Sequence, residues 1–263
     1  MSIACYRLFL LQKNIFNINV GGRMTYLETL KNIFINDGRY MYIVKGLGFS
    51  IGVTLFAAFI GLVVGVILAL FRLSIFYPFK KIEGLSENIK KINPLELFAL
   101  IYVDLIRGTP AVVQLMILAN IVFVGALRNT PIFVVAGLAF GLNSAAYVAE
   151  IIRAGIQGLD KGQMEAAKAL GMPYGLAMKE IIIPQAIKKI LPTLVSEFIT
   201  LLKETSIVGF IGGVDLLRSA NIITSQTYRG VEPLLAVGLI YLVLTSLFTK
   251  FMRVVEKGMR KSD

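Results

Sequence analysis

The fold is decided by the stretch Gly162–Pro184, GQMEAAKALGMPYGLAMKEIIIP, the one long polar interruption in an otherwise apolar chain. Its first part is rich in helix-forming residues, namely Glu165, Ala166, Ala167 and Ala169. Leu170 supplies an apolar contact, and Gly171 stands where a residue in the left-handed conformation usually ends a helix. Pro173 can open a second helix, because the N–H that it lacks would have no partner there. The stretch therefore predicts a short helix, a tight corner and a second short helix.

The composition of the rest of the chain is that of a membrane protein. Of its 263 residues, 56% are hydrophobic, and the mean hydropathy is +0.75, too apolar for a soluble domain. The net charge of +11 would suggest nucleic-acid binding in a soluble protein. An excess of Lys and Arg in cytoplasmic loops explains this charge better, so we predict an integral membrane protein with a lipid bilayer and no nucleic acid as its partner.

Several kinds of chemistry are excluded by residues that the chain lacks. It has no His and a single Cys, Cys5, which excludes His-based catalysis, Cys/His metal sites and disulfides within the chain. It also lacks a GxxxxGK[ST] phosphate-binding loop. We therefore predict no enzyme activity, no catalytic residue, no metal site and no cofactor in this chain, so that any ATP must be bound by another subunit.

Apolar stretches predict an all-α protein with five membrane-spanning helices. They are expected at Gly46–Phe71, Leu97–Leu127, Pro131–Ile156, Leu191–Val214 and Pro233–Phe251. The second contains Pro110, which can kink it. The distribution of Lys and Arg in the loops after the first helix places the amino terminus outside and the carboxyl terminus inside.

The chain is accordingly divided into an amino-terminal segment at residues 1–45, a transmembrane domain at 46–254 and a cytoplasmic tail at 255–263. The amino-terminal segment carries six cations on the outer side, against the charge rule. Gly21-Gly22-Arg23 can be encoded by purine-rich codons that resemble a ribosome-binding site directly before Met24. Our hypothesis is that the protein starts at Met24, which the intact mass of the native protein would decide.

Small residues recur one helical turn apart in two of the predicted spans. The pairs are Gly48 with Gly52, Gly61 with Gly65, and Gly137 with Gly141. Such pairs let two helices approach closely. The alternative is that Gly is simply common in membrane helices.

Charged residues inside the predicted spans are candidates for a substrate pathway, since charges in a membrane usually face a cavity or the bundle interior. Glu197 and Glu204 are seven residues apart in the fourth span and so share one helical stripe, while Lys203 points elsewhere. A negative stripe facing a cavity suits a cation. For Glu204 and Lys203 we favour an internal ion pair, or hydrogen bonding at a helix break, that stabilises the bundle, whereas for Glu197 structural and substrate-binding roles stay open.

Two further positions complete the predicted pathway. Asp104 is a candidate for the cavity wall, although it lies three residues before Arg107, and a local ion pair between them is the simpler explanation. Thr200 lies between the two acids of the fourth span. The predicted pathway residues are thus Glu197, Asp104, Thr200 and Glu204.

The polar stretch carries a resemblance. It resembles the cytoplasmic EAA loop of permease subunits of binding-protein-dependent ABC importers. The matching pattern is Glu165-Ala166-Ala167, three residues, Gly171, nine residues, Ile181, one residue and then Ile183-Pro184. That family usually has Leu before the last Pro, and Ile183 is a substitution of similar volume. The resemblance implies that this loop forms coupling helices that seat in a groove of an ATPase. The implied coupling residues are Glu165, Ala166, Ala167, Leu170, Gly171, Ile181 and Pro184.

More motifs, in order, resemble the polar amino acid branch of these permeases, whose substrates are of the His, Arg, Lys, Gln and Glu type. They are Arg107-Gly108-Thr109-Pro110 with Gln114, Leu142-Asn143-Ser144-Ala145-Ala146-Tyr147 with Glu150 and Arg153, Pro184-Gln185-Ala186, and Leu202-Lys203-Glu204-Thr205-Ser206. The resemblance covers about Leu47 to Glu256. Family members for basic amino acids tend to have Glu where Glu197 stands.

This resemblance implies a type I ABC importer permease fold in a bacterial inner (plasma) membrane. The implied partners are a second permease, identical or homologous, a dimer of ATPases that holds ATP and Mg, and an extracytoplasmic amino-acid-binding protein. We therefore predict the transmembrane subunit of an ATP-driven importer of a polar, cationic amino acid. The alternatives are an ion-coupled secondary transporter or channel that needs no ATPase, and a membrane scaffold without transport.

Overall fold

The computed structural model describes residues 26–74, 76–78, 86, 91–123, 127 and 129–260, which form helices and connecting turns with no strand among them. The proposed start at Met24 and the end of the predicted tail, residues 261–263, lie outside the described residues. The chain divides into two compact units, one ending at Tyr40 and one beginning at Met41.

The first unit contains a short helix, α2 (Tyr26–Phe34), and a single 3-10 turn, η1 (Asn36–Gly38). Arg39 holds the turn together: its guanidinium donates to the backbone oxygen of Asn32 at 2.6 Å and to the carboxylate of Asp37 at 2.6 Å. Asp37 and Gly38 both have positive φ, 59° and 65°. These two residues lie within the turn and interrupt the helical backbone before the long helix that follows.

That long helix, α3 (Tyr40–Leu73), is about 51 Å in length at 1.5 Å per residue, more than enough to cross a bilayer. It begins six residues before the predicted Gly46, because Tyr40–Lys45 contains no helix-breaking residue to stop it. Among the described residues, three helices are long and apolar enough to span a membrane, within Asn36–Leu73, Ile132–Gln157 and Val231–Val254. They coincide with the first, third and fifth predicted spans.

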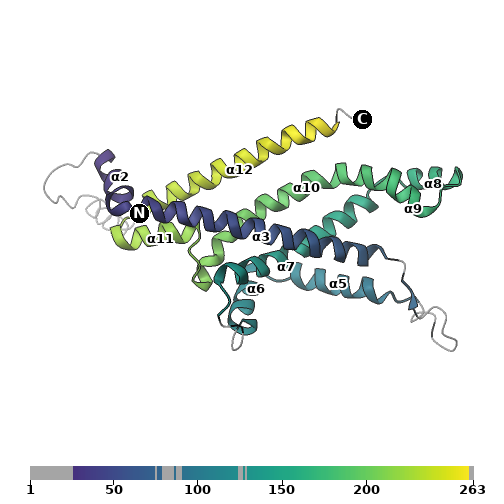
Figure 1. Ribbon diagram of the computed structural model, residues 1–263, viewed down its shortest axis with the longest axis horizontal. Coiled ribbons are helices and arrows are strands. Elements are labelled where there is room, and N and C mark those ends of the chain that lie inside the picture. Colours follow the sequence, from purple (N-terminus) through teal and green to yellow (C-terminus); the bar gives the residue numbers. More distant parts are fainter. Residues whose placement is uncertain are drawn as a thin grey trace, which may run out of the picture. The chain divides into compact units, whose positions relative to one another are not determined.

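Helix α7 (Ile132–Gln157) lies at the centre of the second unit and packs against α5, α6 and α10 (Figure 1). It also meets α3 at members of all three glycine pairs expected to allow close approach. Gly61 and Gly65 on α3 face α7, and Gly137 and Gly141 on α7 face α3. Gly48, in contrast, has no neighbouring atom where a Cβ would lie. Gly52 also meets α7, because a Cβ there would lie 3.1 Å from the ring of Phe133. The packing role therefore holds for these five glycines and not for Gly48.

Gly141→Leu is expected to lower the free energy of unfolding by about 1–3 kcal/mol, as overpacking of a tight interior does. A Cβ at Gly141 would lie 2.7 Å from Cβ of Ile60 and 3.2 Å from the backbone oxygen of Ala57, so α3 and α7 would have to separate. Thermal unfolding of the purified protein in detergent measures the effect. Gly48→Leu is the matched control, and equal unfolding temperatures for the two variants would contradict the prediction.

The second predicted span is not one helix. It is broken into α5 (Pro94–Arg107) and α6 (Ala111–Ile117), which continues as a π-helical turn, η3 (Leu118–Val122), and the two parts are bent by 105°. A single kinked helix from Leu97 to Leu127 was therefore wrong. Pro110 has no N–H to donate and is the N-cap of α6, so the chain restarts there and does not bend smoothly. If the bent pair counts as one span, the described residues hold up to four.

The fourth predicted span, Leu191–Val214, was displaced along the chain. The helix, α10 (Ile183–Glu204), begins eight residues earlier, and after Glu204 the chain continues as a 3-10 turn, η6 (Thr205–Ile211), which ends at Gly212 with φ 86°. Lys188 and Lys189, which lie just before the predicted start, are inside α10. With these lysines and Glu197, α10 is not among the helices counted above as apolar enough to span.

The carboxyl-terminal part consists of α11 (Leu216–Thr227) and α12 (Val231–Arg260). Asp215 is fully buried and accepts hydrogen bonds from the N–H groups of Leu217 at 3.2 Å and Arg218 at 3.1 Å, which starts α11. Ser219 then donates to the backbone oxygen of Tyr42 at 2.8 Å and so fixes α11 to α3. The predicted span Pro233–Phe251 falls within α12.

Candidate functional site

The polar stretch forms the elbow predicted from its sequence, which we define as residues 161–182 between α7 and α10. It consists of α8 (Lys161–Ala169), α9 (Tyr174–Ala177) and a π-helical turn, η5 (Met178–Ile182). Gly171, with φ 77°, makes the corner. Its N–H donates to the oxygen of Lys168 at 2.9 Å, and the N–H of Met172 donates to the oxygen of Ala167 at 3.0 Å, the bonding pattern of a Schellman motif. Pro173 precedes α9 as its N-cap and is not its first residue.

The inner side of the elbow is tightly packed. Ala167, Ala177 and Ile182 are 1%, 0% and 5% exposed, and α8 contacts both α9 and the π-helical turn. The turn then runs without a break into α10. A displacement of α8 is therefore expected to be transmitted to α10.

The outer side of the elbow presents apolar side chains. Leu170 is 81% exposed, Tyr174 54% and Leu176 45%. Of the other predicted coupling residues, Glu165, Ala166, Gly171 and Pro184 are exposed, and Ile181 is half-buried. Exposed apolar residues on an otherwise polar protrusion are typical of a protein contact. That these residues contact an ATPase stays a prediction.

Glu197 is half-buried on α10 and is the predicted pathway residue with a specific polar partner on another helix. The hydroxyl of Ser144 on α7, which is 2% exposed, donates to the Glu197 carboxylate at 2.9 Å. The bond joins the helices on either side of the elbow. Ser144 belongs to a motif quoted above, but the sequence showed no link between it and Glu197, because they are 53 positions apart.

The other three predicted pathway residues are not brought to this pair. Thr200 is exposed and donates to the oxygen of Ser196 in its own helix at 3.1 Å. Glu204 is half-buried at the end of α10, and the described residues show no ion pair between it and Lys203, so the expected pair is not formed. Asp104 is exposed on α5. That these residues line a pathway stays a prediction.

The expected local pair of Asp104 with Arg107 was also wrong. The Arg107 guanidinium lies over the ring of Tyr147, 5.5 Å from its centroid, and no ion pair joins it to Asp104 in the described part of the chain. A cation above an aromatic face is attracted to the ring quadrupole. The contact joins the end of α5 to α7 across 40 positions, a separation that reasoning from neighbours on one helix cannot reach.

Gln114 holds the break between α5 and α6 in place. Its side-chain nitrogen donates to the oxygens of Ile106 at 2.8 Å and Thr109 at 3.1 Å, where the regular helical bonding is interrupted. The Ile106 oxygen also accepts from the N–H of Thr109 at 3.5 Å. The side-chain oxygen of Gln114 accepts from Asn143 on α7 at 2.8 Å. Gln114 and Asn143 stood in the sequence motifs, but only the structure shows that they bind each other.

A network of charges joins the ends of α3 and α7. Arg153 donates to both oxygens of Glu150, at 2.5 and 2.9 Å, and Arg72 at the end of α3 lies 3.5 Å from the same carboxylate. The negative charge of Glu150 is thus shared by two arginines. This arrangement fixes the ends of both helices near the start of the elbow.

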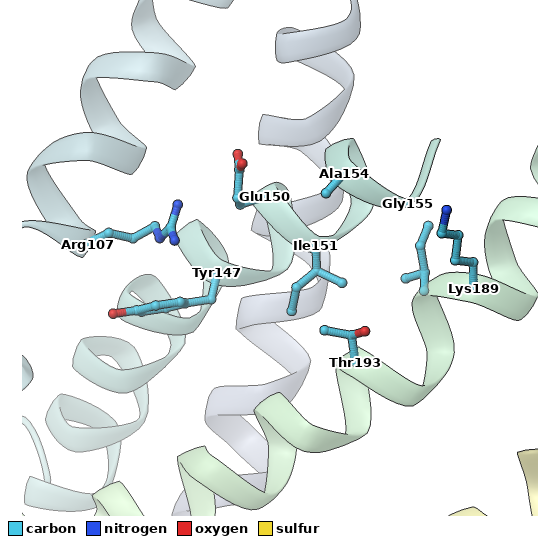
Figure 2. Close-up of a pocket in the computed structure, with 9 residues that line it drawn as sticks. Arg107, Tyr147, Glu150, Ile151, Ala154, Gly155, Lys189 and Thr193 are labelled. Carbon is cyan, nitrogen blue, oxygen red and sulfur yellow. The ribbon is translucent and has the colours of Figure 1, made fainter. Parts of the chain in front are cut away.

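A pocket of about 290 Å³ opens between the end of α5, α7 and the first half of α10 (Figure 2). It is lined by Arg107, Tyr147, Glu150, Ile151, Ala154, Gly155, Lys189, Ile190 and Thr193. Figure 2 shows the guanidinium of Arg107 lying above the face of the Tyr147 ring. The pocket combines an apolar wall with charges of both signs.

Comparison with known sequences gives one consistent result. Residues 89–261 match the family model described as binding-protein-dependent transport system inner membrane component. The arginine transport system permease protein ArtQ of Bacillus subtilis (strain 168) is 42% identical over 226 residues, which are 84% of this chain and 94% of that protein. The putative glutamine transport system permease protein GlnP of Rickettsia bellii (strain RML369-C) is 38% identical, over 83% of this chain and 93% of its own.

Comparison with solved structures agrees. A chain from the crystal structure of an amino acid ABC transporter with histidines matches with a TM-score of 0.75 and 40% identity, over 90% of this chain and 99% of that one. A chain from inward-facing conformations of the MetNI methionine ABC transporter matches with a TM-score of 0.65 at 15% identity, over 84% and 97% of the two chains. The second likeness shows a shared fold and no more.

Proposed function

The chain belongs to the family of inner membrane components of binding-protein-dependent transport systems, and from this premise we propose that it is the transmembrane subunit of an ATP-driven amino acid importer. The names of its relatives, arginine and glutamine permeases, support amino acids as the substrate class. The resemblance to amino acid permeases identified from the sequence motifs is thereby confirmed.

The observation that carries the proposal is the position of the elbow. It is inserted between α7 and α10, the two helices that the bond from Ser144 to Glu197 joins. Closure of an ATPase dimer on ATP would displace the elbow, and α10 would move with it relative to α7. Alternating access then follows from a rigid connection between the nucleotide sites and the pathway, with ATP and Mg²⁺ bound by the ATPases.

The complete transporter in this proposal contains two such permeases, identical or homologous, two ATPases and an extracytoplasmic binding protein. The chain crosses a bacterial inner membrane five times, with the amino terminus outside and the carboxyl terminus inside. In this count the bent pair α5–α6 is one span, and α10 is another despite its charges. Charges on α10 are compatible with a span that borders a water-filled cavity.

The substrate in this proposal is a cationic amino acid. Support comes from Glu197, a half-buried carboxylate whose hydrogen-bond partner among the described residues is the neutral hydroxyl of Ser144. A carboxylate in a membrane cavity without a cationic partner attracts one from a ligand. The alternative, in which Glu197 only ties α10 to α7 through Ser144, makes no selection among amino acids.

The test is reconstitution in liposomes with a candidate ATPase and its binding protein, followed by uptake of a panel of amino acids. We expect uptake that requires ATP and disappears when the ATPase is catalytically inactive. Uptake by this chain alone, driven by an ion gradient, would favour a secondary transporter or channel. An assembled complex whose ATPase activity does not respond to any substrate-loaded binding protein would favour a scaffold.

A further inference from the structure

The pocket of Figure 2 contains one cation whose side-chain donors are all without a hydrogen-bond acceptor among the described residues. The charge of Glu150 is already shared by Arg153 and Arg72, and Lys189 donates to the backbone oxygen of Gly158 at 2.6 Å. Arg107, in contrast, makes no hydrogen bond or ion pair with the residues that the structure describes. Its guanidinium offers five N–H donors to whatever enters the pocket.

The stacking of Arg107 on Tyr147 fixes the direction of these donors. Because the ring covers one face of the guanidinium plane, the N–H groups along its edge are left for a ligand. A planar guanidinium edge matches a carboxylate in a bidentate arrangement. The geometry therefore favours a carboxylate over a single-point acceptor.

The pocket lies directly beside the pair formed by Ser144 and Glu197. Tyr147 follows Ser144 by three residues on α7, and Thr193 precedes Glu197 by four residues on α10, so both pocket residues lie on the elbow side of that pair. One helical turn separates the two levels, about 5–6 Å along the helix axes. The Arg107 guanidinium, stacked on Tyr147, and the Glu197 carboxylate, which accepts only from the neutral hydroxyl of Ser144 among the described residues, thus belong to levels about one turn apart.

We propose that Arg107 binds the α-carboxylate of the transported amino acid, with Tyr147 holding its guanidinium in position. This rests on the proposed function and divides recognition between two sites. Arg107 recognises the group that all amino acids share, and Glu197, one turn away, selects among their side chains. The spacing suits an amino acid whose side chain extends from one level to the other.

Binding of paired probes to the purified permease–ATPase complex in detergent, without binding protein, tests the carboxylate subsite by calorimetry. The pairs are L-arginine with agmatine, and L-glutamine with 4-aminobutanamide; each second compound lacks only the carboxylate. We expect the wild-type complex to prefer the amino acid in at least one pair. Arg107→Gln should weaken binding of that amino acid about 10- to 100-fold, as loss of a charge-assisted hydrogen-bonded pair does, and leave its decarboxylated partner unchanged.

Two further variants separate this role from a structural one. Arg107→Lys keeps the charge without the planar fork and should retain part of the preference. Lys203→Gln removes an exposed cation of α10 that does not line the pocket and should retain all of it. If the wild-type complex bound no probe, the proposed function would fail together with this subsite. If it preferred the amino acid and Arg107→Gln kept that preference, only the carboxylate assignment would be overturned.

Discussion

Leu170→Asp is expected to reduce ATP-dependent uptake by about 30-fold or more while the protein still folds, since a buried interface anchor contributes about 2–4 kcal/mol or more. Leu170 is 81% exposed at the corner of the elbow, so its side chain has little packing within the chain to lose. In contact with an ATPase, a carboxylate at this position would have to be desolvated without a partner. Uptake into proteoliposomes of the reconstituted complex measures the loss.

Leu170→Met is the matched control, because it conserves apolar volume and should keep most of the uptake. The unfolding temperature of Leu170→Asp should equal that of the wild type, and its binding of amino acid in detergent should be unchanged. Undiminished uptake by Leu170→Asp would show that the corner does not contact the ATPase. A loss of folding in Leu170→Asp would contradict the exposed position of the side chain.

The corner at Gly171 could be predicted from the sequence because a helix cap is a local structure. The two hydrogen bonds that close it join residues three and five positions apart, and the one unusual backbone conformation falls on a glycine. The close packing of α3 on α7 was likewise indicated by local glycine spacing. The way the two helices cross decides which glycines contact the other helix. The sequence alone therefore could not distinguish Gly48, which makes no such contact, from Gly61, which does.

The break after Arg107 could not be predicted at its true size. Pro110 indicated a kink, but a bend of 105° interrupts the regular helical bonding of the oxygens of Ile106 and Thr109. Gln114 satisfies them and is itself held by Asn143, 29 positions away. A sequence shows the proline and not the tertiary contact that stabilises a full break.

The candidate site shows the same division between local and distant contacts. Glu197 was identified because a carboxylate in an apolar stretch is conspicuous. Its partner Ser144, and the position of Arg107 over Tyr147, depend on how α5, α7 and α10 pack. The start of α10 was misplaced because the apolar stretch begins only after Lys188 and Lys189, although long cationic side chains can extend from inside a helix to water.

Glu197→Gln is expected to weaken binding of a cationic amino acid by more than about 100-fold, because an ion pair broken on one side in a partly buried site costs about 3–5 kcal/mol. The amide has nearly the same shape, and its oxygen can still accept from Ser144, so the contact of α10 with α7 is kept. Binding of L-arginine and L-glutamine to the assembled complex measures the change. Glutamine serves as the internal control, since its neutral side chain can form a hydrogen bond but no ion pair with a carboxylate and should lose much less affinity.

The two charge variants should fail in different ways if Glu197 selects the side chain and Arg107 the carboxylate. Glu197→Gln should weaken L-arginine and agmatine alike, because both carry the guanidinium, whereas Arg107→Gln should weaken L-arginine alone. Because the two residues would contact opposite ends of one ligand without touching each other, the losses of arginine affinity should add in the double variant. Arginine binding that survived Glu197→Gln unchanged would leave Glu197 as a structural partner of Ser144 and remove the basis for a cationic substrate.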